Sequence, residues 1–469
     1  MLFTSLVFIV FACVFFAFWP LANRASWSRW LYVIVFSLIF YGWHEPRHVF
    51  LILLYASVDF AAGHLIYNRP KHKKLWLILA ITMNIGVLAY FKYAGFLAAN
   101  FNLLLTPLGL PALPVEYHVL PLGISFFTFQ SMTYTVDIYK GKLKPTRNYL
   151  HFLAFLSLFP HLIAGPIVRA GDLLPQMTQP NKVSWADRME GLRRIIIGLF
   201  RKKVISDNLA PAVAAAFATG TTVHSTTFWL IAATLFVIQI YCDFSGYSEM
   251  ARGLAKWMGY EFHENFRQPF LATSTQDLWR RWHISLSTWF RDYVYIPLGG
   301  SKNGEFRTHV NIWITMLLSG IWHGASWNFL AWGGWNALLI SVERIVRWED
   351  RVVKMPCIGP FVANILTVTA FALGMIFFRA ESFGQAAFIF QQIAVFRLDF
   401  SYAVGHLDQS GIVVGVFCVF WNLICFNLGP LIKTNEKVRN HLEIMMLVAM
   451  MFLIALVRGP GSDFVYFQF

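Results

Sequence analysis

Charged residues are scarce in this 469-residue sequence: they make up 13% of it, whereas hydrophobic residues make up 57%. An ordinary soluble domain carries roughly 25% charged residues. Together with a mean hydropathy of +0.54, this deficit excludes a soluble globular protein and indicates a polytopic membrane protein. Cysteine is also scarce, and the five cysteines include no C-x-x-C pair. A disulfide framework and a zinc site are therefore disfavoured, and we expect no bound metal.

Several common catalytic signatures are missing. No G-x-S-x-G elbow occurs, because "GYSEM" ends in Met250. "GGSKNG" lacks the spacing of a phosphate-cradling loop. His323 is followed five positions later by Asn328, not by the Asp of soluble glycerolipid acyltransferases. "QDLWRRW" (276–282) has a displaced Arg-Trp pair and no accompanying cytosolic domain with paired aspartates, which disfavours polymer synthesis.

Long apolar runs recur along the whole chain. A helix needs about 20 apolar residues to cross the roughly 30 Å hydrocarbon core. The pattern predicts an all-α polytopic membrane protein with about 11–12 transmembrane helices. Residues 3–20 have no preceding Lys or Arg and no cleavage pattern, so we expect a retained helix. The predicted spans are 3–20, 29–43, 48–67, 75–99, 119–138, 195–218, 226–242, 309–323, 325–341, 361–378, 411–430 and 442–457.

The formal net charge of +14 comes from clustered Lys and Arg. The positive-inside rule assigns these clusters to the cytoplasm, which places the N-terminus and the nearly uncharged loop 95–118 outside. A smaller part of the positive charge is suited to attracting an anionic cytosolic substrate, such as a nucleotide-bearing acyl donor. The clusters are 69–74, 140–147, 193–203, 347–354 and 433–439.

The segment 243–308 differs from its surroundings because it is polar, aromatic and charged and contains no clean span. We expect short re-entrant or interfacial helices that fold into the membrane domain from the cytoplasmic side. No separate soluble domain is predicted. The chain is therefore taken as a single domain, 1–469, with N-terminal helices (1–140), a catalytic core (141–380) and C-terminal helices (381–469).

Residues 276–293 show helical periodicity. Arg280, His283, Ser287 and Arg291 recur at i, i+3, i+7 and i+11, which predicts one polar face beside a stripe of Trp and Tyr. This face would carry two guanidinium groups, an imidazole and a hydroxyl, a combination that is typical of a functional site. The alternative is an interfacial helix whose arginines pair with lipid phosphates and whose tryptophans lie among the headgroups.

"LLSGIWHGASWNFLAWGG" (317–334) places His323 in an apolar run. A charged residue within a span costs roughly 2.5–3.5 kcal/mol on insertion scales, and a histidine avoids this cost by staying neutral. A neutral imidazole is a general base for acyl transfer. Gly320 and Gly324 are expected to leave room for a substrate near the backbone. The alternative is a structural histidine that donates to a helix carbonyl.

Other polar residues within apolar runs leave a second class of function open. A transporter of an activated acyl or glycan precursor would also need many intramembrane polar groups facing a wet interior. A local hydrogen bond between Asp243 and Tyr247, at i and i+4, is a sufficient structural explanation for that pair. The remaining residues of this kind are Asp59, His64, Asn84, Lys92, Gln130, Asp137 and His161.

A set of blocks along nearly the whole chain resembles the membrane-bound O-acyltransferase family, in its bacterial branch that includes alginate O-acetyltransferases and D-alanyl-lipoteichoic acid acyltransferases. Together the blocks are highly specific, although "WHG" alone would be weak. They are "YFKYAGF" (90–96), "LPLGISFFTFQSMTYTVDIYKG" (120–141), "FPHLIAGPIVR" (159–169), "YCDFSGYSEMARGLAKWMGY" (241–260), "NFRQPFLATSTQDLWRRWHISLSTWFRDYVYIPLGG" (265–300), "LLSGIWHGASWNFLAWG" (317–333), "FFRAES" (377–382) and "FVYFQF" (464–469).

The resemblance implies a ring of membrane helices around a central tunnel that joins a cytoplasmic donor site to the opposite face. His323 matches the family's catalytic histidine, expected as general base, and His283 matches the second histidine on the path, expected to position the donor or assist proton transfer. Arg280, Arg281 and Arg291 are expected to hold the donor's phosphates. The further residues assigned to the substrate and donor site are Ser287, Asp243, Tyr247, Trp322 and Asn328.

The function implied is an enzyme of the bacterial inner membrane that O-acetylates an exported polysaccharide such as alginate. Acetyl-CoA, or a related acyl donor, is expected as a substrate, and no bound cofactor is expected. Expected partners are the lipid bilayer and an SGNH-type acetyltransferase or a small membrane-anchored carrier, with no role for nucleic acid. The alternatives within the family are transfer of D-alanine to teichoic acid, or O-acylation of peptidoglycan or a lipid.

Overall fold

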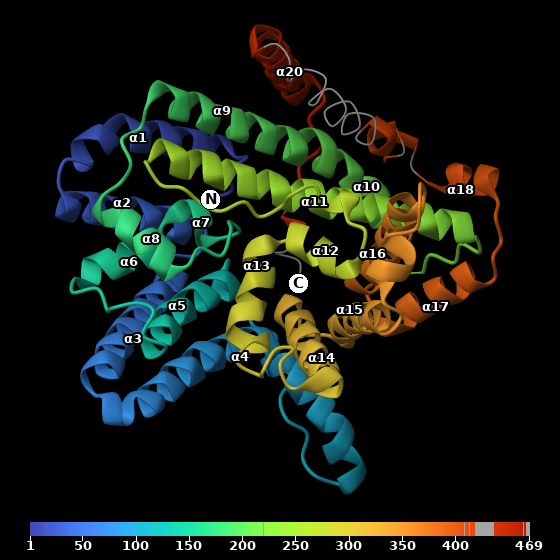
Figure 1. Cartoon of the computed structure of the whole chain (residues 1–469), viewed down its shortest axis with the longest axis horizontal. Helices are drawn as coiled ribbons and strands as arrows, with labels where there is room; N and C mark the ends of the chain where they lie inside the picture. Colours follow the sequence, from blue (N-terminus) through green and yellow to red (C-terminus); the bar gives the residue numbers. More distant parts are fainter. Residues whose placement is uncertain (219, 408, 412, 418–435, 463, 466–469) are drawn as a thin grey trace. The chain divides into compact units, whose positions relative to one another are not determined.

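Helices account for nearly all regular structure, and no strand occurs among the described residues (Figure 1). The structure is a computed structural model that describes residues 1–469 except 219, 408, 412, 418–435, 463 and 466–469. The chain forms two compact units. Unit 1 consists of Met1–Ile195 and Met250–His263, and unit 2 consists of Ile196–Glu249 and Glu264–Phe469.

Unit 1 is built on long apolar helices followed by short ones. Polar side chains mark several of the helix starts: Ser5 accepts a hydrogen bond from the backbone N–H of Phe8, and Asn148 accepts one from Leu150. The helices are α1 (Leu6–Ala22), α2 (Ser26–Gly42), α3 (Val49–Asn68), α4 (Lys73–Leu105), α5 (Ile124–Tyr139), α6 (Tyr149–Ser157), α7 (Phe159–Leu162), α8 (Ala170–Thr178) and most of α9 (Trp185–Phe200).

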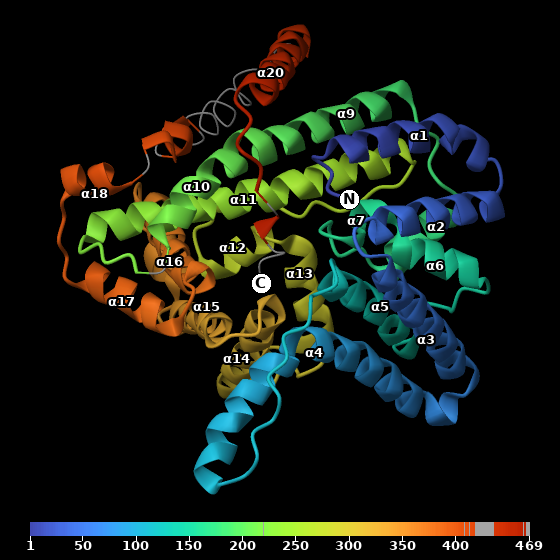
Figure 2. The same ribbon diagram turned by 180° about the vertical axis from the view of Figure 1, so that it is seen from behind.

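Polar residues join three helices inside unit 1. Helices α3, α4 and α5 contact one another in pairs, as both views show (Figures 1 and 2). The buried Asp59 of α3 accepts hydrogen bonds from Asn84 Nδ2 of α4, at 2.9 Å, and from Ser131 of α5. Tyr55 donates to the backbone oxygen of Asn84 at 2.8 Å. These intramembrane polar groups therefore connect helices, as buried polar groups in lipid-facing folds must.

Unit 2 contains the rest of the helices, including three short π-helices. In chain order, the helical segments of unit 2 are the π-helix η4 (Arg201–Ser206), α10 (Asp207–Ala216), α11 (Thr226–Trp257, with its last turns in unit 1), the 3₁₀ turn η5 (Pro269–Leu271), α12 (Thr275–Arg281), α13 (Ile284–Phe290), the π-helix η6 (Arg291–Tyr295), α14 (Gly304–His323), α15 (Trp327–Ile345), the π-helix η7 (Glu349–Val353), α16 (Gly359–Arg379), α17 (Phe383–Ala394), α18 (Phe400–His406) and α20 (Glu436–Leu456).

Glycines allow α14 and α15 to pack closely. A Cβ atom on Gly320 would lie 2.2 Å from the backbone oxygen of Phe329, and one on Gly333 would lie 2.5 Å from that of Met316. A Cβ on Gly324 would lie 2.0 Å from the Phe329 ring. The expectation that Gly320 and Gly324 leave room for a substrate was wrong. The space beside both glycines is filled by α15, because small residues let helices approach closely in a membrane domain.

The protein is an all-α polytopic membrane protein. Among the described residues, four helical stretches are long and apolar enough to cross a bilayer: Pro46–Asn68, Pro70–Leu108, Thr226–Trp257 and Gly359–Arg379. The 33 residues of α4 extend about 50 Å at 1.5 Å per residue, which exceeds the hydrocarbon thickness. Two shorter apolar helices, Leu6–Ala22 and Asn440–Leu456, coincide with the first and last predicted spans.

Two predicted spans differ from the helices found. Over the predicted span 195–218 the helical backbone is continuous to Ala216, with the π-helix Arg201–Ser206 between α9 and α10. The prediction over 119–138 began too early. Helix α5 starts at Ile124, after Gly123, whose φ of 74° lies in the left-handed region. The predicted span 411–430 falls largely on residues outside the described ones.

Candidate active site

His323 is the last residue of α14, and its imidazole is enclosed by aromatic rings. The helix ends there because Gly324 takes an extended conformation. The ring centroid of His323 lies 4.9 Å from that of Trp322, 4.9 Å from that of Trp332 and 5.2 Å from that of Phe378. The side chain is 4% exposed. A buried imidazole among aromatic rings avoids the cost of charge by staying neutral, which is the form that accepts a proton.

His283 lies at a break between two short helices. The prediction of one continuous helix over 276–293 was wrong: α12 ends at Arg281, and α13 starts at Ile284. His283 itself has a φ of 43°, a left-handed conformation that is uncommon for a residue other than glycine. Its imidazole therefore leaves the polar face predicted for it and lies buried, with its ring 4.5 Å from the ring of Phe244.

The break is held by Asn265. Its backbone oxygen accepts from the N–H of Ile284 at 2.9 Å, and its side-chain Oδ1 accepts from the N–H of Ser285 at 3.2 Å. Two N–H groups of the first turn of α13 thus find acceptors outside the helix, as in helix capping. The capping residue lies 18 positions before His283, so a local helical period does not reveal it.

Asn265 also determines which nitrogen of His283 carries the hydrogen. A backbone N–H only donates, so the Asn265 atom facing Ser285 is the oxygen, while Nδ2 donates to Ser248 Oγ at 3.1 Å. His283 Nδ1 lies 3.2 Å from the same oxygen and must therefore be the donor. In neutral His283 the basic lone pair is then on Nε2. Sequence reasoning missed Asn265, although it opens the quoted block 265–300.

One tryptophan connects the two histidines. Trp322 packs edge-on against His323, and its ring centroid lies 6.2 Å from that of His283. Both histidines belong to unit 2. The structure therefore brings together the two residues that the resemblance selected, with the predicted site residue Trp322 between them.

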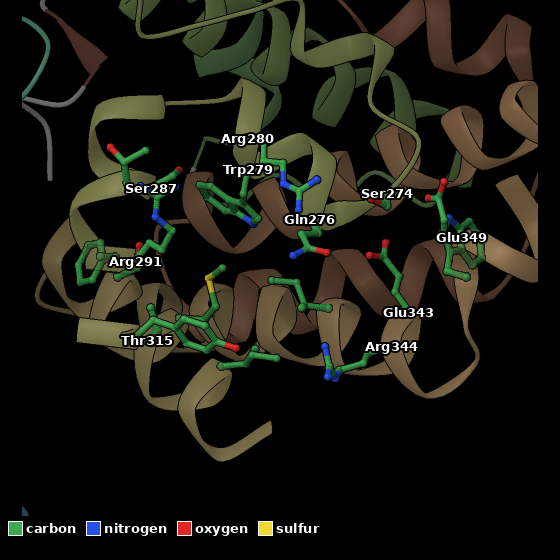
Figure 3. A pocket seen from close by; sticks show the side chains of 18 of the residues that line it. Ser274, Gln276, Trp279, Arg280, Ser287, Arg291, Thr315, Glu343, Arg344 and Glu349 are labelled. Atoms are coloured by element: carbon green, nitrogen blue, oxygen red, sulfur yellow. The ribbon is translucent and has the colours of Figure 1, made fainter. Parts of the chain in front are cut away.

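Residues of α12, α13, α14 and α15 line a cavity of about 690 Å³ (Figure 3). Its volume is in the range of small-molecule sites. Gln276, Trp279 and Arg280 come from α12 and face Glu343 and Arg344 of α15 across it, while Ser287, Arg291 and Thr315 close one end. Three of the predicted donor-site residues therefore share one cavity: Arg280, Ser287 and Arg291.

The arginines around the cavity differ in their pairing. Arg280 forms no ion pair with any described residue, whereas Arg291 is paired with Asp292 at 2.7 Å. Arg281 is paired with Asp277 at 3.0 Å and does not line the cavity. Sequence reasoning missed two lining arginines, Arg344 and Arg347. Arg347 begins the basic cluster 347–354, which had been interpreted mainly as an orientation signal.

The cavity approaches His323 through a pair of tryptophans. Trp279 lines the cavity, and its ring packs edge-on against that of Trp332 with centroids 5.6 Å apart. Trp332 in turn contacts His323. Aromatic contacts therefore connect the cavity, through Trp279 and then Trp332, to His323, the candidate base.

Asp243 lies in a buried charge cluster and not at the cavity. Its Oδ1 pairs with Lys202 Nζ at 2.7 Å, and Lys202 also pairs with Asp207 at 2.9 Å. Asp243 Oδ2 accepts from the backbone N–H of Val465 at 2.6 Å, and Lys202 donates to the backbone oxygen of Ser462 at 2.9 Å. This cluster, which we call the C-terminal clamp, holds Ser462 and Val465 against η4 and α11.

The last two predicted site residues also have structural contacts. The ring of Tyr247 packs on Phe464 with centroids 5.2 Å apart, as part of the same C-terminal packing. Asn328 donates to the backbone oxygen of Ala380 at 2.7 Å, which connects α15 to the end of α16. Neither residue lines the cavity. Among the described residues, no group of three or more His, Cys, Asp or Glu side chains is placed to hold a metal ion.

The chain belongs to the membrane-bound O-acyltransferase family. The family model MBOAT, membrane-bound O-acyltransferase family, matches residues 118–383, which include both histidines and the cavity. The protein is accordingly a membrane-bound O-acyltransferase, as the sequence blocks indicated.

Individual relatives carry more specific names. The chain is 38% identical over 399 residues to a probable alginate O-acetylase of Pseudomonas putida, covering 82% of this chain and 79% of that protein. It is 34% identical to a peptidoglycan O-acetyltransferase of Helicobacter pylori, covering 76% and 72%. It is 25% identical to a teichoic acid D-alanyltransferase of Bacillus subtilis, covering 71% and 84%.

Proposed function

We propose that this protein O-acetylates an exported polysaccharide at the bacterial inner membrane, with an alginate-type polymer as the acceptor and cytosolic acetyl-CoA as the donor. The observation that carries the proposal is the aromatic connection between a cavity containing arginines and the buried imidazole of His323. The similarity to alginate O-acetylases supports the acetyl group and the class of acceptor.

His323 acts as the general base. It takes the proton of the attacking hydroxyl while the new ester bond forms at the acyl carbon. The thioester bond then breaks, and the leaving thiolate receives that proton. His283 Nδ1 donates a hydrogen bond to Asn265 Oδ1, so Nε2 is its proton-accepting nitrogen. Through this nitrogen His283 assists the proton transfer.

The cavity is suited to a phosphate-bearing donor. Arg280 and Arg347 carry guanidinium groups that form no ion pair with the described residues, and both line the cavity. Guanidinium groups bind phosphate oxygens through paired, charge-assisted hydrogen bonds. Arg347 also belongs to a basic cluster that the positive-inside rule assigns to the cytoplasm, which supports entry of the donor from that side.

The acetyl group must continue to the opposite face to reach an exported polymer. We propose that a central tunnel carries it and that an SGNH-type acetyltransferase or a small membrane-anchored carrier completes the transfer. Peptidoglycan is the second candidate acceptor, favoured by the 34% identity to the Helicobacter pylori enzyme.

Mass spectrometry of cell-envelope polymers, with and without this protein, tests the acceptor. We expect ester-linked acetyl groups to disappear from the exopolysaccharide when the protein is removed and to return on complementation. Loss from peptidoglycan instead would select the second candidate and contradict the first. Loss of D-alanyl esters with unchanged acetyl content would contradict the acetyl group itself.

Arg280→Gln tests the donor site. One charge-assisted hydrogen bond contributes roughly 1.5–3 kcal/mol, so we expect KM for acetyl-CoA to rise roughly 10- to 100-fold. The measurement is CoA release by the protein in liposomes containing an acceptor glycan. Arg281→Gln is the matched control, because the neighbouring Arg281 is paired with Asp277 outside the cavity. Equal KM values for wild type and Arg280→Gln would contradict the assignment.

A further inference from the structure

The indole N–H groups of a pair of tryptophans that pack against each other in unit 2 have no hydrogen-bond acceptor in the described part of the chain. They belong to Trp332, which is 2% exposed, and to Trp279, which is 9% exposed. An indole nitrogen can only donate. Buried donors without acceptors are rare because they have lost water without a replacement, and each one calls for a physical reason.

Other tryptophans in unit 2 do find acceptors. Trp335, one turn further along α15 than Trp332, donates to the backbone oxygen of Ala370 at 2.9 Å. Trp229 donates to Val223, and Trp348 donates to Thr273. The two unsatisfied indoles are in contact with each other, with ring centroids 5.6 Å apart. Their shared position, and not tryptophan packing in general, therefore needs explanation.

That position lies on the way from the cavity to the candidate base. Trp279 lines the cavity, and the Trp332 ring lies 4.9 Å from the His323 ring at an interplanar angle of 83°. The two rings therefore lie between the cavity and His323, where an acyl group moving from a donor in the cavity would meet them. Its carbonyl oxygen is an acceptor of the kind that both indoles lack.

We propose that Trp332 is a catalytic residue whose indole N–H binds the acyl carbonyl oxygen during transfer, with the indole N–H of Trp279 as a second donor on the cavity side. This rests on the proposed function of His323 as general base. The acyl donors for which we assign this role to Trp332 are thioesters.

The step balances as follows. The hydroxyl oxygen attacks the thioester carbon while His323 takes its proton, and the carbonyl electron pair moves onto oxygen, where the indole N–H of Trp332 stabilises the negative charge. The carbonyl then re-forms, the carbon–sulfur bond breaks, and the thiolate takes the proton from His323. Donors that are already in place for the developing charge need no reorganisation, which is why such groups contribute strongly to acyl transfer.

Trp332→Phe tests the proposal because it removes the N–H and keeps an aromatic ring. We expect kcat to fall about 10²- to 10³-fold, as for loss of one oxyanion donor, while KM for acetyl-CoA stays unchanged. We expect no loss of melting temperature from hydrogen bonding, because the Trp332 indole N–H forms no hydrogen bond with the described residues. Trp279→Phe should lower kcat in the same direction.

Trp335→Phe is the matched control in the same helix. It removes an indole N–H that does have an acceptor, so we expect a lower melting temperature and wild-type kcat per folded molecule. A Trp332→Phe variant with wild-type kcat, or one whose kcat falls only in proportion to its folded fraction, would overturn the proposal. Absence of His323-dependent CoA release in the wild type would instead refute the proposed function, so the two failures are distinguishable.

Discussion

Replacement of His323 by alanine is expected to leave the protein inserted and folded but to reduce acetyl transfer about 10²- to 10⁴-fold, the usual contribution of a positioned general base. The imidazole packs against aromatic rings from its own helix, α15 and α16, and these remain when it is removed. His323→Gln provides a second variant that keeps most of the side-chain volume and polarity without a base of useful strength. Both variants should lose kcat, measured as CoA release in liposomes.

A histidine elsewhere in the chain provides the control. His151 is also buried, but its Nε2 lies 2.9 Å from the backbone oxygen of Leu174, and its ring stacks on Trp30. His151→Ala should lower the melting temperature and leave kcat per folded molecule unchanged. A His323→Gln variant with full activity would refute the assignment of His323 as base, whatever the effect on stability.

Lys202→Met is expected to destabilise unit 2 strongly. The substitution leaves the buried Asp243 without the cation that pairs with it, and it leaves the buried Asp207 with Lys203 alone. Removing one partner of a buried pair typically costs roughly 3–5 kcal/mol, because the remaining charge is left uncompensated. We expect a large drop in the apparent melting temperature in detergent and easier protease cleavage next to Ser462 and Val465.

The adjacent lysine gives a graded control. Lys203 pairs with Asp207 at 2.8 Å but is 20% exposed, so Lys203→Met should cost less while Lys202 still compensates both carboxylates. The double variant with Lys202→Met and Asp243→Asn should recover part of the loss, because it removes an unpaired buried charge. Equal melting temperatures for wild type and Lys202→Met would contradict the clamp.

The sequence was sufficient for the class of fold, and it selected two histidines that the structure places on either side of Trp322. Composition and the length of the apolar runs predicted a polytopic helical protein, and those properties do not depend on the details of packing. The sequence singled out His323 because an ionisable side chain in a long apolar run is costly to place in a membrane and is therefore rare. The blocks around it and around His283 identified the family, which the match over residues 118–383 confirms.

The local geometry of the site could not be predicted, because residues distant in sequence determine it. The helical period over 276–293 is real, but Asn265 accepts the N–H groups that would otherwise continue the helix through His283. Lys202, counted in a basic cluster as an orientation signal, is 3% exposed and pairs with Asp243. Such pairings form only in the folded chain, and no periodic pattern in the sequence indicates them.

The C-terminal clamp has a consequence for biosynthesis. Asp243 accepts a hydrogen bond from the backbone N–H of Val465, 222 positions later in the chain. Lys202 donates one to the backbone oxygen of Ser462, 260 positions later. During translation, the helices carrying Lys202 and Asp243 leave the ribosome long before residues 459–465 exist. The ion pairs of Lys202 with Asp207 and Asp243 can therefore form long before the two backbone hydrogen bonds that complete the cluster. At typical synthesis rates of about 5–20 residues per second, that interval lasts on the order of ten seconds or more. During that interval the buried charges of nascent unit 2 lack the hydrogen bonds to Ser462 and Val465.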